Sequence, residues 1–303
     1  MNLEKYCGVI PAFYACYDDQ GEVSVERTKA FAEYLVNKGV KGLYLTGSSG
    51  ECIYQNVEER KLVMKAVAEA VKGKTTLIAH VAANNTRDSV ELARYAGELG
   101  MDAIAAIPPI YFRLPEKAIE EYWTAMLEAA GIDFFIYNIP QTTGYTLSVD
   151  LFKKMMAKPG VVGVKNSSMP VEDIIKFKLG SDKKAIVFNG PDEQYLAGRM
   201  VGADGGIGGT YGVMPELFLQ VDKFIEEKRM EEAAALQQDI TAIIYQLCSC
   251  QGGLYSVIKE LLRRDGMNIG QVREPLPRIV ESDKENIDKC EKMIADAKVK
   301  YCK

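Results

Sequence analysis

The sequence has few of the residues on which metal sites and disulfide frameworks depend. Its 303 residues include a single histidine, His80, and seven cysteines without a CxxC pair. A zinc site therefore has almost no ligands to draw on, and an odd number of scattered cysteines is typical of reduced, buried thiols. His80 stands in the apolar run TLIAHVAA without a nucleophile elbow nearby, so we expect a core residue rather than a catalyst. We expect neither a metal nor a cofactor.

Charge and hydropathy exclude two further kinds of partner. The formal net charge of -5 argues against nucleic acid or an anionic membrane surface as the main partner. No apolar run approaches the roughly 18 residues that a membrane helix needs. The first ten residues, MNLEKYCGVI, lack the basic and apolar regions of a signal peptide. We therefore expect a cytoplasmic protein that acts on a small molecule.

Short apolar runs alternate with longer amphipathic segments along most of the chain. Eight runs, from GVIPAFY to DGGIGGT, predict strands, and the helical patterns between them begin at N-caps such as Ser24, Thr86 and Ser148. Eight strand–helix units over residues 1–228 predict an α/β fold, a (β/α)8 TIM barrel that forms the catalytic domain. Residues 229–303 carry only helical periodicity and predict a C-terminal extension of about three helices. An open doubly wound sheet is the weaker alternative, because no Rossmann fingerprint is present.

Polar residues are concentrated in the segments that follow the predicted strands. In a barrel of this kind the active site lies at the C-terminal ends of the strands. After the second to eighth strands the segments read TGSSGE, ANNT, PPIYFR, YNIP, KNSS, NGPDE and GGIGGTYG. Lys165 ends the sixth apolar run, and by itself it would indicate only a strand that reaches solvent. Its place among these segments favours a functional site.

The residue types in these segments support chemistry on a 2-oxo acid. Desolvation at an apolar barrel mouth disfavours the ammonium form of Lys165, and the free amine can attack a ketone to form an imine. Tyr137, one strand earlier, is suited to carry the proton of a reacting hydroxyl. GSSGE can present successive backbone N–H groups to a carboxylate. Each part also has an ordinary structural interpretation, as rim packing for Tyr137 and as a helix-initiating turn for GSSGE.

These motifs resemble those of the N-acetylneuraminate lyase and dihydrodipicolinate synthase superfamily of class I pyruvate aldolases. GSSGE, YNIP, GVKNSS and NGPDE carry the resemblance, which runs from GVIPAFY into the helical tail. It implies a Schiff base between Lys165 and the keto carbon of pyruvate, with Tyr137 as proton carrier. It also implies that Ser48 and Ser49 hold the carboxylate. Tyr111 matches a tyrosine that members lend to a neighbouring subunit's site, and members are commonly tetramers, so we expect a homotetramer.

The loops after strands five and seven favour one branch of the superfamily. The dihydrodipicolinate synthase branch has an arginine shortly after YN-x-P, where this chain has Gln141 and two threonines. NGPDE matches the Gly-x-Asp-Glu of the sialic acid lyases through Gly190, Asp192 and Glu193. In that branch these residues hold the hydroxyls of the sugar's tail, although a helix-initiating turn would also explain two adjacent carboxylates.

The resemblance therefore implies a carbon–carbon lyase that reversibly cleaves N-acetylneuraminate to pyruvate and N-acetylmannosamine. Ser167 stands where lyases often have threonine, and Gly209 where they commonly have serine, so one hydroxyl contact to the substrate is missing. A related aldolase for 2-keto-3-deoxy sugar acids is the main alternative, and 4-hydroxy-tetrahydrodipicolinate synthase is a weaker one. A catalytically silent barrel that senses a ligand is disfavoured, because Lys165, Tyr137 and GSSGE are all intact.

Overall fold

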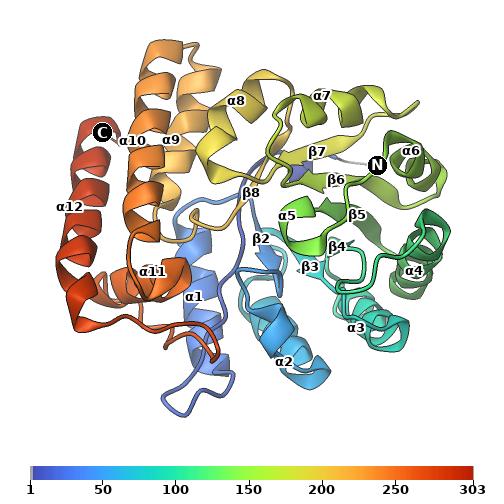
Figure 1. Ribbon diagram of the computed structural model, residues 1–303, viewed down its shortest axis with the longest axis horizontal. Coiled ribbons are helices and arrows are strands. Elements are labelled where there is room, and N and C mark those ends of the chain that lie inside the picture. The colour runs from blue at the N-terminus through green and yellow to red at the C-terminus, as the bar shows by residue number, and fades with distance from the viewer. Residues whose placement is uncertain (1–2, 303) are drawn as a thin grey trace.

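Eight parallel strands form a barrel at the centre of the molecule (Figure 1). The computed structural model describes residues 3–302. Hydrogen bonds join the strands in the order β1-β8-β7-β6-β5-β4-β3-β2, and a parallel bridge from Ala12 to Tyr44 joins the two end strands. The predicted (β/α)8 fold is confirmed. The strands are β1 (Gly8–Pro11), β2 (Gly42–Leu45), β3 (Thr76–His80), β4 (Ala103–Ala106), β5 (Asp133–Asn138), β6 (Val161–Asn166), β7 (Ile186–Asn189) and β8 (Gly205–Gly208).

Helices follow each strand and cover the outside of the barrel (Figure 1). Ser24 and Ser148 accept N-cap hydrogen bonds as expected, but the N-cap of α3 is Asn85, whose side chain accepts from the backbone N–H of Asp88. Thr86 is instead the first helical residue, because the side-chain amide of Asn85, rather than the Thr86 hydroxyl, accepts from the backbone N–H of Asp88 in the first turn. The helices are α1 (Val25–Asn37), α2 (Val57–Val71), α3 (Thr86–Glu98), α4 (Glu116–Ala130), α5 (Pro140–Thr143), α6 (Val149–Ala157), α7 (Glu172–Leu179), α8 (Tyr195–Met200) and α9 (Pro215–Glu226).

Three helices follow the barrel, as the helical periodicity predicted: α10 (Met230–Cys248), α11 (Gly253–Arg264) and α12 (Lys284–Tyr301). Helix α10 packs between α9 and α12 (Figure 1). The division into a barrel and a separate extension at residue 228 stays a prediction, since α9 and α10 pack directly against each other there. Within the described part of the chain, no helix is both long and apolar enough to cross a membrane.

Alternation along β5 sorts its side chains between two apolar layers. Phe134 and Ile136 pack among the residues that lie between strands and helices, whereas Phe135 and Tyr137 belong to the smaller cluster inside the barrel. Successive side chains of a strand point to opposite faces, so this pattern follows directly from the sequence. Tyr137 therefore lies inside the barrel at the C-terminal end of its strand.

Strand β6 approaches β7 closely at Gly163. A Cβ atom at this position would lie 1.8 Å from the carbonyl oxygen of Ile186, so only glycine fits. Beside it, the pairing of β5 with β6 shifts by one residue between Phe134 and Phe135. After this shift Tyr137 pairs with Lys165, which places the two side chains next to each other at the barrel mouth.

Candidate active site

Lys165 and Tyr137 lie together at the C-terminal ends of neighbouring strands. The Lys165 Nζ atom is 3.9 Å from the centroid of the Tyr137 ring and 4.6 Å from that of Tyr44. Both side chains are buried, with Lys165 only 5% exposed. Lysine at a strand end usually reaches solvent along its aliphatic stem. Here the amine instead ends among aromatic rings inside the barrel, where it is shielded from bulk water.

An aromatic cluster lies beneath this pair. The rings of Tyr44 and His80 contact the Tyr137 ring edge-on, at centroid distances of 5.9 and 6.0 Å. His80 Nδ1 lies 3.0 Å from the carbonyl oxygen of Thr46. Burial and, to a smaller extent, the nearby Arg60 charge lower the pKa of His80 to about 3. His80 is therefore a neutral core residue at physiological pH, as expected, and it packs behind Tyr137.

The GSSGE loop has backbone N–H groups without an acceptor at the barrel mouth. The N–H groups of Gly50 and Glu51 bond to the carbonyl oxygens of Gly47 and Ser48 within the turn itself. For the N–H groups of Gly47, Ser48 and Ser49, residues 3–302 provide no acceptor. The anion nest stays a prediction, and only these three N–H groups of the motif are available for it. The Ser48 side chain is exposed and the Ser49 side chain is buried.

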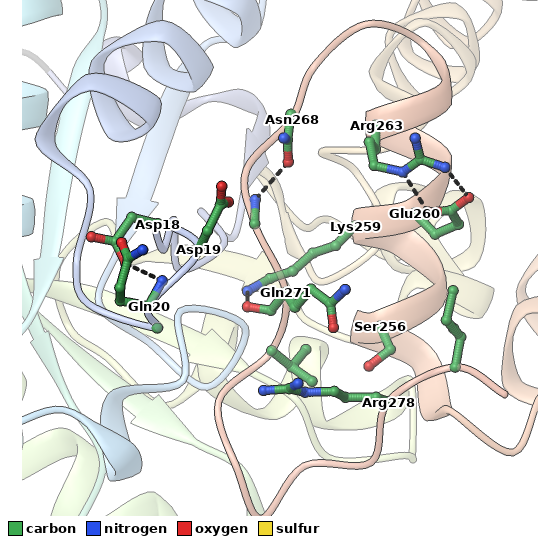
Figure 2. Close-up of a pocket in the computed structure, with 14 residues that line it drawn as sticks. Asp18, Asp19, Gln20, Ser256, Lys259, Glu260, Arg263, Asn268, Gln271 and Arg278 are labelled. Carbon is green, nitrogen blue, oxygen red and sulfur yellow. Dashed lines mark hydrogen bonds and ion pairs between the residues drawn. The ribbon is translucent and has the colours of Figure 1, made fainter.

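A buried ion pair ties this loop to the C-terminal helices. Glu51 adopts a left-handed backbone conformation, with φ of 55°, and its carboxylate accepts from Lys259 Nζ at 2.7 Å. The other carboxylate oxygen accepts from the backbone N–H of Arg273 at 2.9 Å. Figure 2 shows Lys259 extending from α11 toward Gln271, whose carbonyl oxygen it also bonds. The cavity of about 380 Å³ in that view includes neither Lys165 nor Tyr137 in its wall.

Lys259 and Tyr255, both on α11, are residues that sequence reasoning missed. The side chain of Tyr255 is hydrogen-bonded to Ser49, with the two oxygens 3.0 Å apart. The pair of glycines at 252 and 253 marks the start of a new helix, but helical periodicity does not reveal which face meets the barrel mouth. The predicted extension is therefore part of the candidate active site.

The loop after β7 contains Gly190, which lies beside Ser167, and the two predicted carboxylates, Asp192 and Glu193. A Cβ atom at Gly190 would lie 1.9 Å from Ser167 Oγ, so glycine makes room for that hydroxyl. Glu193 is half-buried in the short 3-10 helix η3 (Asp192–Gln194). The structure thus brings Ser167, Gly190 and Glu193 to the same end of the barrel as Lys165, because they follow β6 and β7.

Asp192 joins the loops after β7 and β8. Its Oδ2 atom accepts from both the backbone N–H and the hydroxyl of Thr210, each at 2.6 Å. Its Oδ1 atom is buried without a partner among the described residues and lies over Gly208. Burial raises the pKa of Asp192 to about 6, although the Thr210 hydrogen bonds oppose this shift. The carboxylate therefore holds the loop that contains Gly209 and Thr210.

Tyr111 lies apart from the other predicted site residues. Its side chain is 91% exposed and packs edge-on against Phe112, which is also exposed. The backbone of Tyr111 has φ of 83°, which is unusual for a residue other than glycine. Within one chain the tyrosine is presented outward rather than toward Lys165.

No group of three histidine, cysteine, aspartate or glutamate side chains within residues 3–302 is arranged to hold a metal ion. The seven cysteines are all unpaired. The reactive groups that the structure places at this end of the barrel include the lysine amine, the phenols, the carboxylates and the backbone N–H groups.

Fold and site together define a class of enzyme, the Schiff-base aldolases built on a parallel barrel. Residues 5–294 match the model of the dihydrodipicolinate synthetase family, and the chain belongs to this family. It is 56% identical over 302 residues to an N-acetylneuraminate lyase of Mediterraneibacter gnavus. The aligned region covers 99% of this chain and 96% of the relative. The resemblance inferred from the sequence motifs is confirmed.

Solved structures of two related proteins resemble this chain over almost its whole length. A Ruminococcus gnavus sialic acid aldolase, solved as a catalytic lysine mutant, superposes with a TM-score of 0.98 at 56% identity, over 99% of each chain. A Clostridium difficile protein, CdNal, solved in complex with mannosamine, has a TM-score of 0.86 at 27% identity, over 97% of this chain and 99% of that one.

Removing the ammonium group that neutralises Glu51 should destabilise the protein. In Lys259→Met the buried carboxylate loses its partner, and we expect the free energy of unfolding to fall by about 3–5 kcal/mol. The double variant Lys259→Met with Glu51→Gln should recover part of this loss, measured by urea unfolding. Lys292→Met, which breaks an exposed ion pair with Asp296, should change stability by less than about 1 kcal/mol. A loss that small in Lys259→Met would contradict the anchoring role of the buried pair.

The raised pKa of Asp192 predicts a pH-dependent stability difference. Between about pH 4 and pH 6 the folded protein retains a proton on Asp192 that the unfolded chain releases, so rising pH destabilises the wild type. Asp192→Asn has no such proton, and its stability relative to wild type should rise by about 1.4 kcal/mol per pH unit over this range and then level off. Urea unfolding of both proteins at several pH values measures this stability difference.

Asp88→Asn is the matched control for this experiment. The hydrogen bond from the Asn85 side chain holds the pKa of Asp88 below its usual value, so the folded protein has released a proton that part of the unfolded chain still binds near pH 4. The stability of Asp88→Asn relative to wild type should therefore fall slightly between pH 4 and pH 5 and then stay constant. If the Asp192→Asn difference does not rise between pH 4 and pH 6, Asp192 does not titrate in this range.

Proposed function

We propose that this protein is a class I aldolase that reversibly cleaves N-acetylneuraminate to pyruvate and N-acetylmannosamine. The observation that carries the proposal is the pairing of Lys165 with Tyr137 inside the barrel, with the amine 3.9 Å from the ring centroid. The 56% identity to an N-acetylneuraminate lyase over nearly the whole chain supports this choice of substrate.

In the proposed reaction the Lys165 amine attacks the C2 carbonyl carbon of the open-chain sugar acid. The Tyr137 hydroxyl donates its proton to the leaving hydroxyl group, and loss of water leaves a protonated imine, which withdraws electrons from the C3–C4 bond. As that bond breaks, the Tyr137 phenolate takes the proton of the C4 hydroxyl and N-acetylmannosamine leaves as the aldehyde. The bonding electrons remain as an enamine on Lys165. Tyr137 returns the proton to C3. Water then hydrolyses the protonated imine, the released proton returns to the Tyr137 phenolate, and pyruvate and the free amine are restored.

The substrate's two ends have separate proposed partners. The N–H groups of Ser48 and Ser49 are free for the carboxylate, and the Ser49 hydroxyl is held at the same loop by Tyr255. Glu193 is the proposed acceptor for the tail hydroxyls, with Ser167 and Gly190 beside it. Asp192 contributes to tail binding at least by positioning the Gly209–Thr210 loop.

A homotetramer and a cytoplasmic location belong to the same proposal. The exposure of Tyr111 and Phe112 supports a subunit contact at this surface, through which Tyr111 would complete a neighbouring site. The dihydrodipicolinate synthase reaction is disfavoured by the residue after YNIP. Gln141 on α5 cannot form the bidentate pair with a second carboxylate that an arginine would form.

Trapping with borohydride tests the roles of Lys165 and Tyr137 separately. With pyruvate, wild type should gain one reduced pyruvate unit on Lys165, located by peptide mass mapping, and Lys165→Ala should gain none. Tyr137→Phe should still trap pyruvate while its kcat for N-acetylneuraminate falls by roughly 10²–10⁴-fold, the range for a lost acid–base group. Turnover by Lys165→Ala, or near-normal kcat in Tyr137→Phe, would remove that residue from its role.

A panel of 2-keto acids tests the substrate. Wild type should release pyruvate from N-acetylneuraminate faster than from shorter 2-keto-3-deoxy sugar acids, and it should not condense pyruvate with aspartate semialdehyde. Glu193→Gln should lower kcat/KM for N-acetylneuraminate by about tenfold with little effect on pyruvate trapping, because one of the two acceptor oxygens is replaced by a donor and the remaining one loses its charge. The exposed Glu33→Gln is the matched control. Preference for a shorter acid would identify the protein as an aldolase of 2-keto-3-deoxy acids.

A further inference from the structure

The loop after β8 lacks a side chain where related lyases commonly have a serine. A Cβ atom added at Gly209 would lie 3.3 Å from Ser49 Oγ and 3.5 Å from the hydroxyl oxygen of Tyr255. The hydroxyl oxygen of a serine lies one bond beyond Cβ. A serine at position 209 whose hydroxyl pointed toward Ser49 and Tyr255 would therefore contact the hydroxyl oxygens of both residues. The Tyr255 hydroxyl therefore lies beside the space that a serine at 209 would fill.

Tyr255 comes from the C-terminal helices and is held by two direct contacts, which are themselves fixed by neighbouring residues. Its hydroxyl is hydrogen-bonded to Ser49, and its ring packs on Tyr14 at a centroid distance of 6.3 Å. Tyr14 in turn donates a hydrogen bond to the carbonyl oxygen of Gly209 at 2.7 Å. Four residues further along α11, on the same face of the helix, Lys259 bonds to Glu51. These contacts fix the position of the hydroxyl relative to both loops.

The surroundings of this hydroxyl are those of the substrate site. Burial raises the pKa of the Tyr255 phenol above its usual value, and Tyr137 and Asp192 add to the shift, although the Ser49 hydrogen bond opposes it. The phenol therefore stays protonated at physiological pH. A phenolic hydroxyl has one donor and two acceptor positions, and the bond to Ser49 uses only one of them. The remaining capacity is available to a ligand hydroxyl.

We propose that the Tyr255 hydroxyl binds a hydroxyl group of the sugar acid and so supplies the contact that Gly209 leaves out. The proposal rests on the proposed function and adds a specificity-determining residue from outside the barrel. It also explains why glycine suits position 209, because a side chain there would crowd the tyrosine hydroxyl and Ser49.

Four full-length proteins test the proposal: wild type, Tyr255→Phe, Gly209→Ser and the double variant. In Tyr255→Phe, kcat/KM for N-acetylneuraminate should fall by about tenfold, the upper range for one lost hydrogen bond, while pyruvate trapping on Lys165 changes less. Gly209→Ser alone should also lower kcat/KM, because the serine crowds Tyr255. In the double variant the serine hydroxyl has room, and kcat/KM should exceed that of both single variants.

Tyr245→Phe is the matched control, since Tyr245 lies on α10 with 67% of its side chain exposed. It should match wild type, and urea midpoints should show that all variants fold. If Tyr255→Phe lowers trapping and cleavage by the same factor, Tyr255 acts only through Ser49, and the proposal is wrong. A double variant no better than either single variant, or unchanged cleavage in Tyr255→Phe, would also overturn it.

The outcome is separable from that of the proposed function. If wild type does not cleave N-acetylneuraminate, the proposed substrate is wrong, and the same four proteins are then compared on the sugar acid that wild type does cleave. Recovery in the double variant on that substrate supports the Tyr255 contact, and its absence overturns the contact independently.

Discussion

The pairing of β5 with β6 is the constraint on which the candidate site depends. A one-residue change of register would turn every following side chain of one strand to the opposite face. The observed shift beside Phe135, together with the close approach that Gly163 permits, places Lys165 opposite Tyr137 inside the barrel. The proposed imine chemistry needs an amine shielded from bulk water and a proton carrier beside it, and this register places a buried amine next to a phenol.

Buried polar contacts hold the loops around that pair. Glu51 anchors the GSSGE loop to Lys259, and Asp192 anchors the loop after β8 through Thr210. Burying a charge is unfavourable unless it is paired or hydrogen-bonded, so each contact strongly selects one loop position. The Oδ1 atom of Asp192, which has no partner within residues 3–302, is the exception, and burial of this carboxyl group is the main cause of its raised pKa.

The C-terminal helices take part in the site instead of only covering the barrel. On helix α11, Tyr255 contacts Ser49 and Lys259 contacts Glu51, so the middle and the last residue of the GSSGE motif are held by residues about 200 positions further along the chain. A barrel alone would leave this loop without these two partners. Substrate specificity in such an enzyme can therefore change through the added helices while Lys165 and Tyr137 stay the same.

The sequence alone determined the alternation of strands and helices and the motif residues that follow the strands, because apolar periodicity and N-cap chemistry are local. It also supported the family, which the comparisons confirmed. Only the tertiary structure revealed Tyr255, Lys259 and the exposure of Tyr111, because each depends on contacts between residues distant in the chain or on their absence. Periodicity shows that a helix has a buried face, but packing decides which residues that face meets.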